Sequence, residues 1–139
     1  MKTKPSQFLF IDTNVADKQT LIAGVAANVK VVELNDKTDA LTQIAAALKG
    51  QKNLDAIHII SHGSEGELDF ASGAINSANL STYQSQLKKI GASLSKDGDL
   101  LLYGCEVFFL GLIVFWGFFL VVGCVVWGIV VILFINLVV

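Results

Sequence analysis

Arginine is absent from this chain, and proline and cysteine are scarce. The 139 residues include one proline, two cysteines and two histidines, with 10 basic residues, all lysine, against 12 acidic ones. With a net charge of −2 and dispersed lysines, the chain lacks the concentrated basic charge of a nucleic-acid-binding protein. Two cysteines cannot build a disulfide scaffold, and no cysteine or histidine pair has zinc spacing. We therefore expect no nucleic-acid partner, no metal site and no cofactor.

Charge is also absent from one end of the chain. Every charged residue lies between Lys2 and Glu106, and none follows. We expect a single domain over residues 6–107 and an apolar tail over residues 108–139. The N-terminus has a basic start, but its apolar run is only 8–11, whereas a signal peptide needs roughly 7–15 apolar residues. No signal peptide is therefore expected.

The domain alternates between strand-like and helix-like patterns. Short apolar runs predict strands over 8–12, 30–34, 54–61 and 100–103. Apolar residues at helical spacing predict helices over 17–29, 39–48 and 81–94. We expect a loop over 62–66 and a hairpin formed by 67–70 with 74–75. Strands and helices in this order favour a Rossmann-like, three-layer α/β fold. We predict a parallel sheet of about four strands with helices on both faces.

Two dipeptides follow neighbouring strands of this predicted sheet. His62-Gly63 follows the third strand and Gly104-Cys105 follows the fourth. The carboxyl ends of parallel strands meet at one edge, and neighbouring strands lie about 4.8 Å apart. An imidazole beside a thiol can take its proton, and the thiolate is the nucleophilic form. The sequence therefore predicts a catalytic dyad, in which Cys105 attacks a peptide carbonyl and His62 protonates the leaving amine.

Residues around this pair are candidates for further roles. Gly63 and Gly104 let the backbone turn sharply, so the N–H groups of Gly63 and Cys105 would be able to face a developing oxyanion. Asp12, at the end of the first predicted strand, and Ser61, beside the histidine, are candidate supporting residues. Sequence spacing alone does not place either of them in the site.

Each of these residues also has a structural interpretation. A histidine after a strand is commonly a loop or core residue, and a cysteine after an apolar strand is commonly a small buried side chain. His58 alternates with His62 along its strand, and we expect it to be structural. Three acidic residues, Glu65, Glu67 and Asp69, would either select a basic substrate side chain or form the solvated face of the hairpin.

Four segments of the sequence resemble a known family. They are FID at 10–12, AIHIISHGSEG at 56–66, NL at 79–80 and DLLLYGCEV at 99–107. Together they resemble the bacterial domain-of-unknown-function family number 4347, which stands near the front of large secreted or surface repeat proteins. Its His-Gly and Gly-Cys pairs are similar to those of the caspase, gingipain and separase group of cysteine peptidases. The resemblance implies a caspase-like fold and matches His62 and Cys105 to the catalytic positions of that group.

The sequence departs from the family directly after this match. The family continues with a small-residue, Gly-containing turn into a helix, whereas FFLGLIVFWGFFL stands here from position 108. We expect a truncated or frame-shifted product with an impaired site. As a helix the tail would measure about 50 Å against a hydrocarbon core of about 30 Å. It is therefore a candidate single transmembrane helix, with the N-terminal domain on the cytoplasmic side.

Three functions follow from these observations. The first is a cysteine endopeptidase-like domain acting on a protein or peptide substrate. The second is a non-catalytic adhesion or surface module that keeps the fold without turnover. The third is a membrane-anchored module whose head binds a partner.

Overall fold

The computed structural model describes residues 5–64, 66–104, 120–124 and 131–135. The strands are β1 (Gln7–Asp12), β2 (Val29–Leu34), β3 (Leu54–Ile60), β4 (His62–Ser64), β5 (Glu67–Phe70), β6 (Gly73–Asn76), β7 (Leu94–Tyr103), β8 (Leu120–Cys124) and β9 (Val131–Ile135). The helices are α1 (Lys18–Ala23), α2 (Ala40–Ala47) and α3 (Gln84–Gly91), with a 3-10 turn η1 (Leu80–Tyr83) before α3.

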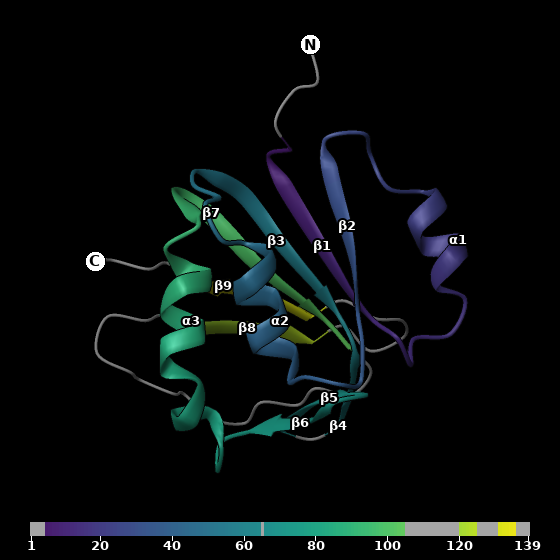
Figure 1. Ribbon diagram of the computed structural model, residues 1–139, viewed down its shortest axis with the longest axis vertical. Helices are drawn as coiled ribbons and strands as arrows, with labels where there is room; N and C mark the ends of the chain where they lie inside the picture. Colours follow the sequence, from purple (N-terminus) through teal and green to yellow (C-terminus); the bar gives the residue numbers. More distant parts are fainter. Residues whose placement is uncertain (1–4, 65, 105–119, 125–130, 136–139) are drawn as a thin grey trace.

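Four parallel strands form the main part of the larger sheet. Their order is β2-β1-β3-β7, and β9 and β8 continue the sheet as antiparallel strands. The carboxyl ends of the four parallel strands point toward a second, three-stranded sheet of β4, β5 and β6 (Figure 1). The predicted α/β fold with four parallel strands is therefore confirmed, in the strand positions that the apolar runs indicate.

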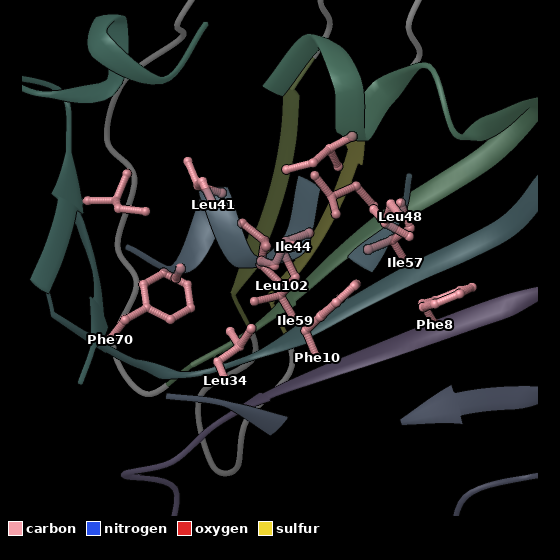
Figure 2. Packing of buried hydrophobic residues seen from close by; sticks show 14 of the residues in the cluster. Phe8, Phe10, Leu34, Leu41, Ile44, Leu48, Ile57, Ile59, Phe70 and Leu102 are labelled. Atoms are coloured by element: carbon pink, nitrogen blue, oxygen red, sulfur yellow. The ribbon is translucent and has the colours of Figure 1, made fainter. Parts of the chain in front are cut away.

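One face of the large sheet carries the hydrophobic core. Alternate strand residues point to the same face, and on this face they pack against α2 and α3 (Figures 1 and 2). The core residues from the large sheet include Phe8, Phe10, Leu34, Ile57, Ile59, Leu100 and Leu102, and those from the helices include Leu41, Ile44 and Ile90. The segment Phe8–Phe10 is apolar on both faces, because Leu9 is also buried, which explains its appearance in the sequence as a continuous apolar run.

The helices agree only in part with the expected three layers. Asp39 caps α2 by accepting a hydrogen bond from the backbone of Thr42, at 2.8 Å.

The helix predicted over 17–29 is shorter in the structure, where α1 ends before Gly24. Because α1 buries no residue, little packing stabilises a longer helix. α1 lies beside β2 (Figure 1), and Lys18 forms an ion pair with Glu33 of that strand. α2 and α3 share one face of the sheet (Figure 1), and the prediction of helices on both faces stays a prediction.

The segment after β3 differs from its prediction as a loop. Residues His62–Ser64 form β4, which pairs antiparallel with β5, and β5 pairs with β6 as the predicted hairpin. The short β4 strand has too few residues to show period-two alternation, which is the signal that identifies strands in sequence. The strand assignment matters because it ties His62 to the hairpin and not only to β3.

β7 is longer than predicted and contains an irregularity. Leu54 pairs with Leu94 and Ala56 with Asp99, so β7 has extra residues against β3 between these two pairs. Gly98 lies in this irregular stretch, and a Cβ there would stand 2.5 Å from the backbone oxygen of Leu54. The Lys-Asp-Gly-Asp sequence at 96–99 thus forms a bulge inside a strand.

The apolar tail is described only at Leu120–Cys124 and Val131–Ile135, and both segments are strands. β9 pairs with β7 at Leu102↔Val131 and with β8 along its length. The predicted C-terminal apolar helix is not found in these segments, whose β-branched residues favour strands. Within the described ranges no helix is both long and apolar enough to cross a membrane.

Candidate functional site

The ends of β3 and β7 are held side by side at the carboxyl edge of the sheet. Ile60 is in register with Tyr103, and the next residue, Ser61, donates a backbone hydrogen bond to the Tyr103 oxygen at 3.0 Å. His62 follows Ser61, and Gly104, which is buried, follows Tyr103. The predicted nucleophile, Cys105, lies outside the described residues, as does Glu65 of the acidic group. The structure therefore describes the histidine side of the predicted dyad.

The imidazole of His62 has one defined partner. The side chain is exposed, and its Nε2 lies 3.0 Å from the backbone oxygen of Asn14. A carbonyl oxygen only accepts, so Nε2 carries the proton in this hydrogen bond. In the neutral ring, Nδ1 is then the basic nitrogen, and it has no hydrogen-bond partner among the described residues. The lone pair of Nδ1 is therefore not used by any described hydrogen-bond donor.

The Asp12 carboxylate joins the end of β1 to the turn at Asn14 and to the hairpin. The side chain is 0 % exposed and accepts from the Asn14 N–H at 3.1 Å. Both of its oxygens also lie 3.1 Å from the backbone nitrogen of Ala71, in the turn between β5 and β6. No hydrogen bond joins the Asp12 carboxylate to His62 among the described residues; both share contacts with the Asn14 turn.

Ser61 and Gly63 have backbone-centred environments. Ser61 is buried, and its hydroxyl donates to the His62 backbone oxygen at 3.0 Å. Gly63 is half-buried in β4, opposite Leu68 of β5. Ser61 therefore fixes the backbone that carries the imidazole. The expected roles of the Gly63 N–H and of Gly104 toward an oxyanion stay predictions.

His58 belongs to a separate network on the sheet. Its Nδ1 lies 2.9 Å from the Tyr103 hydroxyl and its Nε2 lies 3.0 Å from Oε1 of Gln7, and its ring stacks on Tyr103 at 5.8 Å. Burial lowers the pKa of His58 below its ordinary value of 6.5 and raises the pKa of Tyr103. A neutral His58, donating to Gln7 and accepting from Tyr103, joins three strands and shares no hydrogen-bond partner with His62.

The acidic side of the hairpin faces His62 across the β4–β5 pair. Asp69 stands directly opposite His62 in the register. Burial raises the pKa of the Asp69 carboxyl, Glu67 raises it further by hydrogen bonding and charge, and Ser64 and His62 oppose this rise. Glu67 also accepts from the Asn76 side chain at 2.7 Å. In the described part of the chain, no three His, Cys, Asp or Glu side chains gather to hold a metal ion.

Sequence reasoning missed the partner of His62. The acceptor is the main-chain oxygen of Asn14, and a backbone group leaves no signature in residue type. The available signal was the Asp12-Thr-Asn14 sequence, because an aspartate commonly accepts from the N–H two residues later and so forms a turn. That turn follows β1 at the same sheet edge as His62, which the predicted topology already indicated.

A comparison with known protein families shows which family the chain belongs to. The sequence profile described as Domain of unknown function (DUF4347) matches residues 8–108. The chain belongs to this family. The resemblance predicted from the His-Gly and Gly-Cys segments is thereby confirmed at the level of the family, whose description assigns no activity. No curated protein matches this member of DUF4347.

Proposed function

We propose that this DUF4347 domain is a caspase-like cysteine peptidase domain with His62 and Cys105 as its dyad. The observation that supports it is the register of β3 and β7. His62 is the second residue after Ile60, and Cys105 is the second residue after its register partner, Tyr103. Adjacent strands lie about 4.8 Å apart, so two residues equally far beyond a registered pair are well situated to react together.

The hydrogen bond of His62 indicates which nitrogen acts. Nε2–H is held on the Asn14 oxygen at 3.0 Å, so Nδ1 is the nitrogen that takes the thiol proton. The Cys105 thiolate then attacks a peptide carbonyl, and the C–N bond breaks as His62 returns the proton to the leaving amine. Water, deprotonated by the same nitrogen, hydrolyses the thioester, releasing the acid and regenerating the thiol. The Asn14 oxygen stabilises the imidazolium that forms in between.

A peptide with an electrophilic group at its carboxyl end tests this function. We expect it to modify Cys105, as identified by peptide mapping, and we expect His62→Ala to slow the modification by roughly 10²–10⁴-fold, the usual contribution of a general base. Cys124→Ala is the matched control, because it removes the other cysteine of the chain. That variant is expected to react at the rate of the unaltered protein.

Two results would contradict the proposal. Modification that proceeds equally fast in His62→Ala would mark Cys105 as an incidental thiol. Absence of modification, together with retained binding to bacterial surface components in Cys105→Ala, would favour the non-catalytic surface module.

A further inference from the structure

Asp12 is an unusual residue for its environment. It is the last residue of β1, its side chain is 0 % exposed, and no ion pair to it occurs among the described residues. A buried carboxylate is costly unless hydrogen bonds satisfy it. Here the donors are the backbone N–H groups of Asn14 and Ala71. Ala71 lies 59 residues after Asp12 in the sequence. The carboxylate therefore joins two segments that are far apart in sequence.

The first segment is the turn that presents the acceptor of His62. The Asn14 N–H donates to Oδ2 of Asp12, and the Val15 N–H donates to the backbone oxygen of Asp12 at 3.1 Å. The Val15 N–H and the Asn14 carbonyl belong to one planar peptide group and point in opposite directions. Fixing the N–H on Asp12 thus directs the Asn14 oxygen away from Asp12, and that oxygen accepts from His62.

The second segment is the hairpin that carries the imidazole. The Ala71 N–H lies 3.1 Å from both carboxylate oxygens of Asp12, directly after β5. β5 pairs with β4, in which His62 is opposite Asp69. The carboxylate therefore holds the Asn14 N–H, in the turn that carries the acceptor oxygen, and the Ala71 N–H, in the hairpin that carries the ring.

We propose that Asp12 is a positioning residue that sets the tautomer of His62. It holds the Asn14 oxygen and the β4–β5 hairpin together so that the proton stays on Nε2 and Nδ1 remains the basic nitrogen. This role rests on the proposed function for its catalytic meaning. The tautomer itself is a property of the folded chain that does not depend on Cys105.

Nitrogen-15 NMR of the histidine rings in the full chain tests the inference. The chain has two histidines, and the spectrum of His58→Gln identifies the signals of His62. We expect the Nε2–H tautomer for His62 in the unaltered protein. In Asp12→Asn one of the two accepting oxygens becomes an NH2 group that cannot accept from a backbone N–H. This loss loosens the turn or the hairpin, so we expect a mixture that contains the Nδ1–H tautomer. Labelling of Cys105 by the peptide electrophile is expected to slow by about 100-fold, the scale of a small misplacement.

Asp36→Asn is the matched control, because it makes the same chemical change at an exposed position; the His62 tautomer is expected to stay unchanged. A folded Asp12→Asn variant with the tautomer of the unaltered protein would overturn the proposal. If Asp12→Asn does not fold, the unaltered protein decides. Slow hydrogen exchange of the Asn14 and Ala71 amides together with the Nε2–H tautomer supports the role, and fast exchange of either amide or the Nδ1–H tautomer overturns it. If the unaltered protein is not labelled at Cys105 but the His62 tautomer responds to Asp12→Asn as expected, the peptidase proposal is rejected and the role of Asp12 stands.

Discussion

At the scale of single residues, the two histidines of the chain have opposite environments. His62 is exposed and donates to a backbone oxygen, whereas His58 is half-buried between Gln7 and Tyr103. A strand at this position alternates its side chains, which is why the sequence indicated a structural role for His58. The partners of His58 come from two other strands, so spacing within one strand did not identify them.

The network of His58 predicts a stability that depends on pH. Burial lowers the pKa of His58 below 6.5 in the folded state, so the unfolded chain takes up this proton at a higher pH than the folded protein does. The contribution is complete above about 6.5 and decreases as the pH falls below that value. We expect urea unfolding to show lower stability at pH 5 than at pH 7.5, with a smaller difference in His58→Gln. An equal decrease in both proteins would exclude His58 as the cause.

At the scale of secondary-structure elements, Gly98 determines how β7 follows β3. The bulge brings its backbone so close to Leu54 that a Cβ would stand 2.5 Å from a main-chain oxygen. Because backbone on both sides must shift, we expect Gly98→Ala to lower the free energy of unfolding by about 1–3 kcal/mol. Gly24→Ala is the control, because its Cβ would meet only the Leu21 oxygen at 3.7 Å. Denaturant titration of both variants measures the difference, and equal stabilities would contradict the close approach.

The elements that the sequence predicted well are those whose own residues carry a clear local pattern. β1, β3 and α2 each have a continuous apolar run or a helical face with a capping residue, such as Asp39 before α2. The elements that it missed depend on contacts between distant segments. β4 exists because it pairs with β5, and α1 is short because it buries nothing. In the candidate site, the place of His62 directly after the β3 segment was predictable from the sequence, and the Asn14 oxygen was not, because it is a backbone group.

At the scale of the whole molecule, the strands of the apolar tail cover the β7 edge of the parallel sheet. β9 pairs with β7, so deletion of residues 108–139 would leave the edge of β7 unpaired. We expect this deletion to lower stability by at least about 1 kcal/mol, which corresponds to a shift of about 4–8 °C in the melting temperature for a domain of this size. Circular dichroism against temperature measures it.

If the tail is a membrane anchor, we expect its deletion to leave the melting temperature unchanged. An unchanged melting temperature, together with loss of the chain from carbonate-washed membranes after the same deletion, would support an anchor and contradict a role in the sheet.

The reach of the Asp12 carboxylate has a consequence for biosynthesis. Its donor at Ala71 lies 59 residues further along the chain, and the strand that leads to Cys105 emerges later still. A nascent chain of which only the first half has left the ribosome therefore contains His62 and Asn14, but neither Cys105 nor the Ala71 N–H that joins the hairpin to Asp12. The reactivity that we propose would therefore arise only after synthesis of all three stretches, late in translation of the domain.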